Sequence, residues 1–231
     1  STEWLEKNLS KVRIIDASWH MPSSKRNAYN EYLKAHIENT VFFDLDKNSD
    51  EKSHLPHMLP NEEKWGKIVS DSGIKNSDHL IIYDNSDTIS SCRCWYSFIY
   101  FGHEPNKVSV LDGGLKKWLN EKKPITDKMT IFKKSEYAVI ENKSLVKNKE
   151  QIFKNITLKK FELIDARSEE RFKGQAPEPR KGLKGGHIKN SKNIPFTECL
   201  NKNDRTFKSK EELIKIFKKQ DIDNKKDVVF T

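Results

Sequence analysis

The segment that runs from Asp84 into a predicted helix carries the residues best suited to chemistry. It holds two carboxylates, several serines, Cys92 and Arg93 within residues 84–93. In a parallel α/β sheet, ligands bind beyond the carboxyl ends of the strands, where loops lead into helix N-termini. Backbone N–H groups at such a helix start stabilise an anion or a thiolate. The segment therefore predicts a place where an anion or a thiolate is held.

Two other groupings have suitable residue types at unsuitable spacing. His54 and His57 stand three apart, but no cysteine or carboxylate lies nearby at the spacing of a zinc-binding helix, so we expect no metal site. Cys92 and Cys94 are two apart on a predicted helix, hence ~200° apart around its axis, which prevents them from chelating or bridging. We expect both to pack within the helix, and Cys199 to be buried as a small hydrophobic residue.

The composition limits the classes of protein that can hold these residues. Of 231 residues, 35% are hydrophobic and 33% charged, and 5 Trp, 12 Phe and 6 Tyr supply bulk for a core, so wholesale disorder is excluded. No apolar run reaches the ~18–20 residues of a membrane span, and no signal sequence opens the chain, so we expect no membrane partner. Three cysteines fit a reducing compartment. We predict a soluble, cytoplasmic protein.

The net charge of +9 comes from lysines spread along the chain. Only seven of the 43 basic residues are arginine, and the lysines stand in small pairs. Nucleic-acid binders usually concentrate charge on one face and interleave aromatic residues for stacking. We therefore expect no nucleic-acid partner, and interpret the charge as a contribution to solubility.

Short apolar runs alternate with amphipathic stretches in the first half of the chain. The predicted strands, rich in β-branched residues, span residues 12–15, 80–83 and 108–111. Helical spacing of apolar residues covers 61–72, with Asn61 as the predicted N-cap, and 90–102. Strands that alternate with helices predict an α/β fold with mainly parallel sheets flanked by helices.

The second half repeats this order, and the repeat is the most informative pattern in the sequence. Leu-Ile-Asp-Ala at 163–166 repeats Ile-Ile-Asp-Ala at 14–17, and Gly-His-Ile at 186–188 repeats Ala-His-Ile at 35–37. The apolar run that ends at Thr231 repeats the run that ends at Tyr83. The spacings between these motifs agree to within three residues. The repeat predicts two similar α/β domains in tandem.

The predicted domains span residues 1–122 and 144–231, with a polar linker at 123–143. The second copy stops at its central strand, where a parallel sheet would be left with a buried strand edge uncovered. We therefore expect that Thr231 is not the natural C-terminus.

Four residues at equivalent positions of the two copies are expected to be structural. His36 and His187 precede strands in both copies. Asp16 and Asp165 end strands, and we expect each to bond to loop backbone.

Several short motifs stand in a fixed order along the chain. The first half contains Asp-Ala-Ser-Trp (16–19), Phe-Phe-Asp-Leu-Asp (42–46), Leu-Pro-His-Met-Leu-Pro (55–60), Ser-Ser-Cys-Arg-Cys-Trp (90–95), Phe-Gly-His (101–103) and Leu-Asp-Gly-Gly (111–114). The second half contains Asp-Ala-Arg (165–167), Arg-Phe-Lys-Gly (171–174), Pro-Glu-Pro-Arg (177–180), Gly-His-Ile (186–188) and Asn-Ile-Pro-Phe (193–196). Over nearly its whole length the chain resembles the tandem-domain rhodanese-type sulfurtransferases.

The resemblance implies a fold of two rhodanese-like domains, the second incomplete in this chain. In that family the first domain is catalytically silent, with Asp where the second has Cys, and Asp84 fits the silent position. The resemblance places the catalytic Cys directly after Thr231. We therefore expect the 231-residue chain itself to be inactive.

Within the family, two residues favour the 3-mercaptopyruvate branch over the thiosulfate branch: Arg180 in Pro-Glu-Pro-Arg, and His57 before Met-Leu-Pro. By carry-over from the family, Arg180 would bind the substrate carboxylate, for which a bidentate guanidinium is well suited. Arg93 would line the same cleft between the domains. Asp46 and His57 would form a proton relay with a serine of the absent loop.

The implied reaction is a double displacement. A Cys thiolate takes sulfur from a small-molecule donor and becomes a persulfide, with release of pyruvate. A thiol acceptor, such as a thioredoxin-like protein or a small thiol, or cyanide then removes the sulfur. No cofactor is implied.

Two functions of other classes stay open on the sequence. The chain could be a catalytically inactive rhodanese-like module used for binding or regulation, because no Cys occupies either loop position in these residues. It could also be an anion- or phosphate-handling enzyme on a related fold. The residues encoded after Thr231 discriminate, since a Cys-Gly-Ser-Gly-type loop supports sulfur transfer and a non-Cys residue excludes it.

Overall fold

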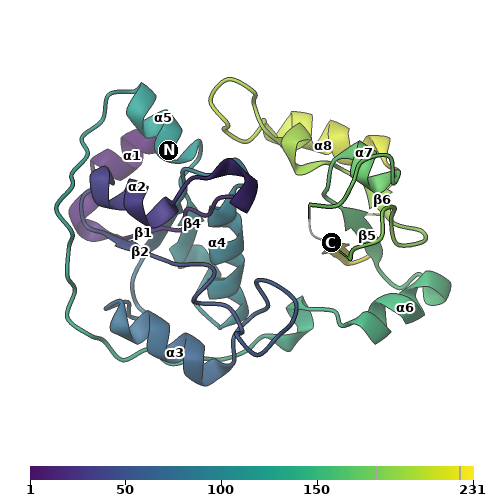
Figure 1. Ribbon diagram of the computed structural model, residues 1–231, viewed down its shortest axis with the longest axis horizontal. Coiled ribbons are helices and arrows are strands. Elements are labelled where there is room, and N and C mark those ends of the chain that lie inside the picture. The colour runs from purple at the N-terminus through teal and green to yellow at the C-terminus, as the bar shows by residue number, and fades with distance from the viewer. Residues whose placement is uncertain (180–181, 224) are drawn as a thin grey trace. The chain divides into compact units, whose positions relative to one another are not determined.

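Each half of the chain forms its own parallel sheet (Figure 1). The computed structural model describes residues 1–179, 182–223 and 225–231, and divides into a first unit, Ser1–Leu145, and a second unit, Val146–Thr231. The first sheet has the order β2-β1-β3-β4 with every pair parallel, which confirms the predicted α/β class. Its strands are β1 (Arg13–Asp16), β2 (Thr40–Phe42), β3 (Leu80–Tyr83) and β4 (Val108–Val110).

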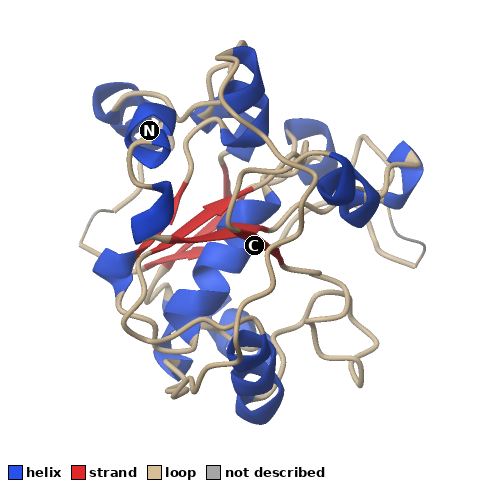
Figure 2. Ribbon diagram, turned by 90° about the vertical axis from the view of Figure 1, so that its left-hand side faces the viewer, coloured by secondary structure: helices blue, strands red, loops and turns tan. Residues whose placement is uncertain are grey.

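Successive side chains of the central strands enter two separate apolar clusters, as the alternation of a strand requires. On β1, Ile15 belongs to one cluster and Ile14 to the other. Helices cover both faces of the sheet (Figure 2). The cluster of Ile15 includes residues of α3 (Glu62–Asp71) and α4 (Ser90–Tyr100), and the cluster of Ile14 includes residues of α1 (Thr2–Glu6) and α5 (Gly114–Asn120).

The predicted helices are present, with their ends shifted by one or two residues. Asn61 caps α3 as predicted, because its side chain accepts the N–H of Lys64. On the buried face of α3, the Trp65 ring is fully buried and stacks on Phe101 with 4.6 Å between ring centroids. The helix α4 ends at Tyr100, before Gly102, whose backbone is left-handed (φ 84°). That glycine conformation explains why α4 is shorter than its apolar pattern.

The predicted linker, residues 123–143, lies along the first unit. Thr126 and His36 exchange both of their backbone hydrogen bonds at 2.9 Å. Further on, the Arg13 guanidinium stands 3.5 Å from the centre of the Phe132 ring. Tyr137 is buried, and its hydroxyl is 3.0 Å from Nδ1 of His103. The segment is thus held by side-chain packing and backbone hydrogen bonds, although its sequence has little periodicity.

The second unit has a smaller parallel sheet in the order β6-β5-β7. Its strands are β5 (Glu162–Asp165), β6 (Lys192–Asn193) and β7 (Val228–Phe230). Its helices are α6 (Lys149–Leu158), α7 (Glu169–Phe172) and α8 (Lys210–Lys219). The remaining helix, α2 (Ala28–Lys34), belongs to the first unit. Short 3₁₀ turns span Leu9–Lys11, Pro22–Ser24, Pro105–Lys107, Lys143–Leu145 and Phe196–Cys199.

Backbone hydrogen bonds confirm the internal repeat. The N–H of Ala17 donates to the carbonyl of Tyr83 at 2.9 Å, and the N–H of Ala166 donates to that of Thr231 at 3.0 Å. Thr231 therefore occupies in the second unit the place that Tyr83 has in the first. In each unit a central strand, β1 or β5, pairs in parallel with a strand on either side.

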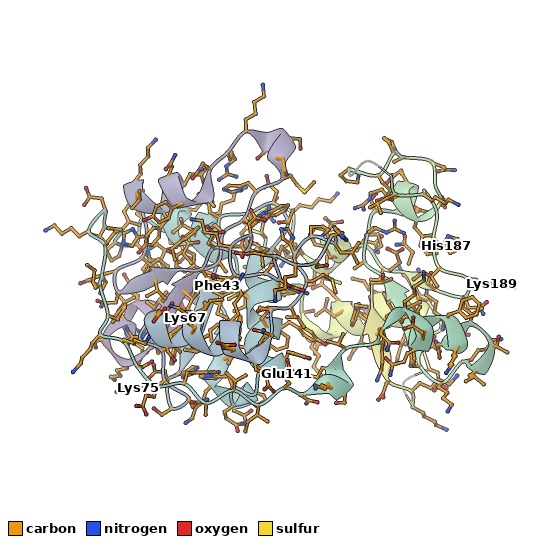
Figure 3. All side chains as sticks on the ribbon, turned by 60° about the horizontal axis from the view of Figure 1, so that its bottom comes forward. Phe43, Lys67, Lys75, Glu141, His187 and Lys189 are labelled. Carbon is orange, nitrogen blue, oxygen red and sulfur yellow. The ribbon has the colours of Figure 1, made fainter. Side chains whose placement is uncertain are left out.

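The repeated histidines are structural in both units. His36 is buried, and its Nδ1 lies 2.7 Å from the carbonyl of Tyr32, on whose ring it stacks. His187, labelled in Figure 3, makes the same pair of contacts with Phe172, at 2.8 Å from its carbonyl and 3.8 Å between ring centroids. Each histidine thus fastens the turn before a strand to the preceding helix.

One cysteine differs from its expectation. Cys92 and Cys94 both lie on α4, as predicted, and Cys94 is buried. Cys199 is only partly buried, so the expectation that it is buried was wrong. It ends the 3₁₀ turn that begins at Phe196, which is 37% exposed, and this turn runs along the surface of the second unit.

Candidate active site

The loop after β3 holds a carboxylate in a cradle of backbone N–H groups. Asp84 follows β3 directly and is buried. Its two oxygens accept the N–H groups of Ser86 and Ser91, each at 2.8 Å. Ile89, in a left-handed conformation (φ 51°), turns the chain into α4. The loop therefore has the predicted capacity to hold an anion, and the side chain of Asp84 occupies it.

Hydroxyl groups tie this loop to the end of β1. Ser86 Oγ and Ser90 Oγ lie 2.7 Å apart, and the backbone N–H of Trp19 donates to them at 2.8 and 3.0 Å. The N–H of Asn85 donates to Ser18 Oγ at 2.8 Å. These bonds fix the position from which the Trp19 side chain extends.

Asp46, His57 and Trp19 form a cluster beyond the carboxyl ends of β1 and β2. His57 Nε2 lies 2.7 Å from Asp46 Oδ1. The indole N–H of Trp19 donates to both Asp46 oxygens at 3.1 Å, and its ring meets His57 edge-on at 4.8 Å between centroids. The structure thus brings together the two residues for which the resemblance implies a relay, and it adds Trp19 to them.

Arg93 presents a partly buried guanidinium to this cluster from α4. Its Nη2 donates to the carbonyl of His57 at 2.5 Å, and its Nε is buried without a hydrogen-bond partner. Burial lowers the pKa of Arg93, and electrostatic interactions with the nearby Tyr96 and Cys94 act in the opposite direction. No carboxylate pairs with Arg93 in the part of the chain that the structure describes. A partly buried guanidinium without a carboxylate partner favours the binding of an anionic ligand.

A network of four charged side chains stands beside β5 in the second unit. Arg167 pairs with Asp165 at 2.5 Å and with Glu178 at 2.7 Å, and Arg171 pairs with the other oxygen of Glu178 at 2.6 Å. Burial opposes ionisation of Asp165, but the hydrogen bonds and charge of Arg167 outweigh it and hold its pKa below the usual range. The hydrogen bond from Arg171 is the main cause that lowers the pKa of Glu178.

Arg180, the substrate-binding residue that the resemblance implies, lies outside the described residues. Glu178 stands two positions before it in the Pro-Glu-Pro-Arg motif, with a side chain only 3% exposed. Sequence reasoning missed both Glu178 and Trp19, although each stands within a motif that it singled out. The residue types alone gave no sign of the contacts, since the partners come from separate loops.

The three thiols have little of the character of a nucleophile. Burial, reinforced by the charge of Asp84, raises the pKa of Cys92 to about 11. Burial also raises the pKa of Cys94 well above its usual value, and that of Cys199. Because the thiolate is the reactive form, none of the three is poised to accept sulfur at neutral pH.

No group of three or more His, Cys, Asp or Glu side chains is arranged to hold a metal ion among residues 1–179, 182–223 and 225–231. His54 is exposed, and His57 directs Nε2 to Asp46. Over the same described ranges, no helix combines the length and the apolar character needed to cross a bilayer.

Comparisons with known proteins agree with this architecture. A sequence model of the "Rhodanese-like domain" matches residues 1–121 and 148–231. Mouse 3-mercaptopyruvate sulfurtransferase is 38% identical over 239 residues, which cover 100% of this chain and 80% of the mouse protein. Rat thiosulfate sulfurtransferase is 37% identical over 240 residues, with the same two coverages of 100% and 80%. The crystal structure of SseA, a 3-mercaptopyruvate sulfotransferase from Escherichia coli, superposes with a TM-score of 0.89 at 31% identity, covering 99% of this chain and 86% of SseA.

Proposed function

Since the chain belongs to the rhodanese-like family of sulfurtransferases, we propose that it moves a sulfane sulfur from 3-mercaptopyruvate, or from thiosulfate, to a thiol or to cyanide. The observation that carries this assignment is the Arg93 guanidinium, which lies beside the Asp46–His57 pair without a carboxylate partner among the described residues. An anionic donor such as 3-mercaptopyruvate supplies the missing negative charge. Its carboxylate is bound by Arg180, with Arg93 lining the same site.

The nucleophile belongs to the position after Thr231. Thr231 corresponds to Tyr83 by its backbone hydrogen bond, so the next residue of a longer chain corresponds to Asp84. In the first unit that position receives two backbone N–H groups. A cysteine held in the same way has its thiolate stabilised, which is the requirement for attack on sulfur.

The reaction balances as two displacements. The Cys thiolate attacks the sulfur of 3-mercaptopyruvate, the C–S bond breaks, and its electron pair takes up the thiol proton at carbon, which gives pyruvate and a Cys persulfide. His57, held by Asp46, relays protons at the donor thiol together with a serine of the loop that follows Thr231. An acceptor thiolate, on a thioredoxin-like protein or a small molecule, then takes the outer sulfur and frees the Cys thiolate.

The proposed domain organisation agrees with this function. Residues 1–122 form a catalytically silent domain, 123–143 a linker, and 144–231 part of the catalytic domain. Arg180 and His57 favour 3-mercaptopyruvate over thiosulfate. The three free cysteines agree with a reducing compartment, and we propose the cytoplasm.

Pyruvate release from 3-mercaptopyruvate by the protein extended past Thr231 tests the proposal. We expect kcat/KM to fall by about 10- to 100-fold in Arg93→Ala and in Arg180→Ala, since each removes a charge-assisted contact. The exposed Lys184→Ala is the matched control and should keep the wild-type rate. Release of pyruvate at the wild-type rate by both arginine variants would refute the assignment.

A second candidate is a rhodanese-like module that binds without catalysis. It is favoured by one observation, that Asp84 fills the anion cradle of the first unit with its own carboxylate. A residue other than Cys directly after Thr231 would decide for this candidate. A Cys there, with pyruvate release, decides against it.

A further inference from the structure

Asp16 and Asp165 stand at the same place in the two units but differ in their charge partners. Both end a central strand, both are almost fully buried at 2% and 1% exposed, and both accept the N–H of the residue two positions on, at 2.9 and 3.0 Å. Asp165 is also bound by the guanidinium of Arg167 through both oxygens. The equivalent of Arg167 in the first unit is Ser18. Within the described residues, no cationic group lies within ion-pairing distance of Asp16.

The Arg167 guanidinium fills a defined set of acceptors in the second unit. It binds the carboxylate of Asp165, one oxygen of Glu178, and the carbonyl of Gly186 at 2.7 Å. Gly186 immediately precedes His187, just as Ala35 precedes His36 in the first unit. Two of the three acceptor positions, those of Asp16 and Ala35, therefore recur in the first unit.

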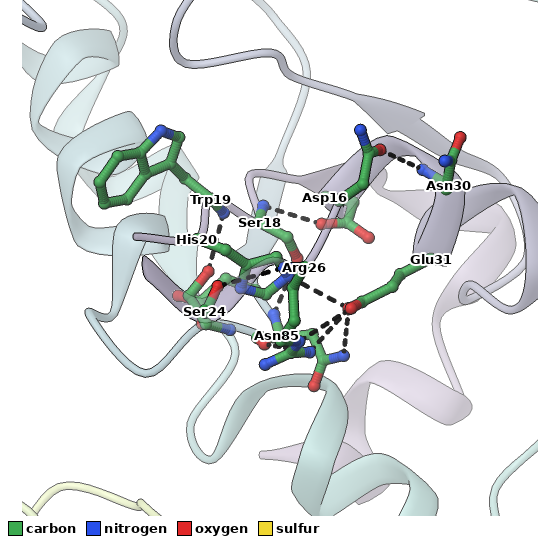
Figure 4. Close-up of polar contacts among 12 residues, drawn as sticks. Asp16, Ser18, Trp19, His20, Ser24, Arg26, Asn30, Glu31 and Asn85 are labelled. Atoms are coloured by element: carbon green, nitrogen blue, oxygen red, sulfur yellow. Dashed lines mark hydrogen bonds and ion pairs between the residues drawn. The ribbon is translucent and has the colours of Figure 1, made fainter. Parts of the chain in front are cut away.

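A cavity of about 240 Å³ lies where the Arg167 side chain has no counterpart. Asp16, Ser18 and Ala35 line it, together with the ring of Tyr32 and with Leu115 and Leu119 of α5. Glu31 also lines it, but its carboxylate is already engaged by Arg26 at 2.6 and 2.8 Å, by His20 at 3.1 Å and by Asn85 at 3.1 Å (Figure 4). The buried charge left to a ligand in this cavity is that of Asp16.

We propose that this cavity is a binding site for a small organic cation that carries a guanidinium group. The guanidinium takes the place of the missing arginine, with two N–H groups directed to the Asp16 carboxylate and one to the Ala35 carbonyl. The apolar walls of Leu115 and Leu119 hold the alkyl part of the ligand, and the Tyr32 ring borders it. Two cations, Arg26 and Lys34, also line the cavity. Arg26 is paired with Glu31, and the remaining positive charge of Lys34 disfavours a ligand with more than one positive charge. The site is independent of the proposed sulfur transfer.

Titration of the 231-residue chain with methylguanidinium chloride, followed by ¹H–¹⁵N NMR, tests this site. We expect saturable shifts of the amides of Ser18, Ala35 and Asn85, with a dissociation constant of about millimolar for so small a ligand. Tetramethylammonium chloride, which has the charge without N–H donors, should give only small, non-saturating shifts. Shifts that are linear and equal for the two salts would overturn the proposal.

Four variants separate the site from nonspecific salt effects. Asp16→Asn keeps the acceptor for the Ser18 N–H but removes the charge, and should weaken methylguanidinium binding by about 10-fold or more. Ser18→Arg supplies the missing side chain internally and should abolish binding, while Lys184→Ala, at an exposed position outside the cavity, should bind within about 2-fold of wild type. Leu119→Trp, at a 41% exposed position on the cavity wall, blocks the cavity even if Ser18→Arg fails to fold. Wild-type affinity in Asp16→Asn, or in both cavity-filling variants, would refute the proposal.

Discussion

The buried carboxylate of Asp16 makes the stability of the first unit depend on pH. Burial is the main cause that raises the pKa of Asp16 from 3.8 to about 6, with a further contribution from the charge of Asp84. The hydroxyls of Ser18 and Tyr83 oppose it only in part. At ~1.4 kcal/mol per pKa unit, the difference between folded and unfolded chain corresponds to about 3 kcal/mol.

The direction in which the free energy of unfolding changes with pH follows from proton binding. Between pH ~4 and ~6 the folded chain holds a proton on Asp16 that the unfolded chain has already lost. The free energy of unfolding therefore falls as the pH rises through this window, and is level above it. Asp16→Asn has no such dependence, and we expect it to gain up to about 3 kcal/mol relative to wild type between pH 4 and 7.

Urea unfolding followed by tryptophan fluorescence measures this difference. All five tryptophans lie in the first unit, and Trp65 and Trp118 are fully buried, so the signal reports that unit alone. Subtracting the Asp16→Asn curve from the wild-type curve cancels the contributions of all other groups. Asp71→Asn, at the exposed end of α3, should leave the slope between pH 4.5 and 7 unchanged, because lysine contacts lower the pKa of Asp71 out of this window. Parallel pH profiles for wild type and Asp16→Asn would refute the reasoning.

Three further outcomes are expected from the structure. Gly114→Ala should destabilise the first unit by about 2–4 kcal/mol in the same urea assay, because Gly114 has φ 57° and an added Cβ would stand 2.5 Å from the Asp84 carbonyl oxygen. Glu178→Gln should destabilise the second unit by about 3 kcal/mol at pH 7, measured by circular dichroism, since it removes the negative charge that pairs with two arginines. The loss should shrink as the pH falls from 4.5, the ordinary pKa of glutamate, through the lowered pKa of folded Glu178, where the wild-type carboxyl takes up a proton. Cys92 should react with a thiol reagent at pH 8 more slowly than an unperturbed cysteine, by about 100-fold, given its pKa of about 11; modification at the rate of a free thiol would contradict its burial.

The strands and the long helices of the first unit could be predicted because local sequence and burial agree there. Residues 80–83 form β3 as predicted, since all four side chains are buried between two helical layers. The helix α3 was equally clear, with a capping Asn61 and a buried face. The path of residues 123–143 could not be predicted. Its attachment rests on backbone bonds to His36 and on single rings such as Phe132, which leave no periodic pattern.

The candidate site could be predicted only in part, and that part came from resemblance to a family. The pairing of Asp46 with His57 came from resemblance to a family, not from spacing, and the structure places them 2.7 Å apart. The indole bond of Trp19 joins loops that follow two different strands, so no local pattern encodes it. Asp16 and Asp165 look alike in sequence and were expected to behave alike. Their environments differ because of the residue two positions later.

That position, Ser18 in the first unit and Arg167 in the second, has a different role in each unit. In the second unit Arg167 neutralises Asp165 and binds Glu178, which in turn pairs with Arg171. In the first unit Ser18 instead accepts the N–H of Asn85 and thereby fixes the loop that begins with Asp84. One side chain cannot perform both tasks, because an arginine that reaches over the aspartate has no hydroxyl to offer to the loop. Because Ser18 holds the loop of the first unit, no arginine stands at that position to offset the buried charge of Asp16. This uncompensated charge lowers the free energy of unfolding by about 3 kcal/mol. A guanidinium ligand in the adjoining cavity would restore the missing charge while the serine keeps its bond.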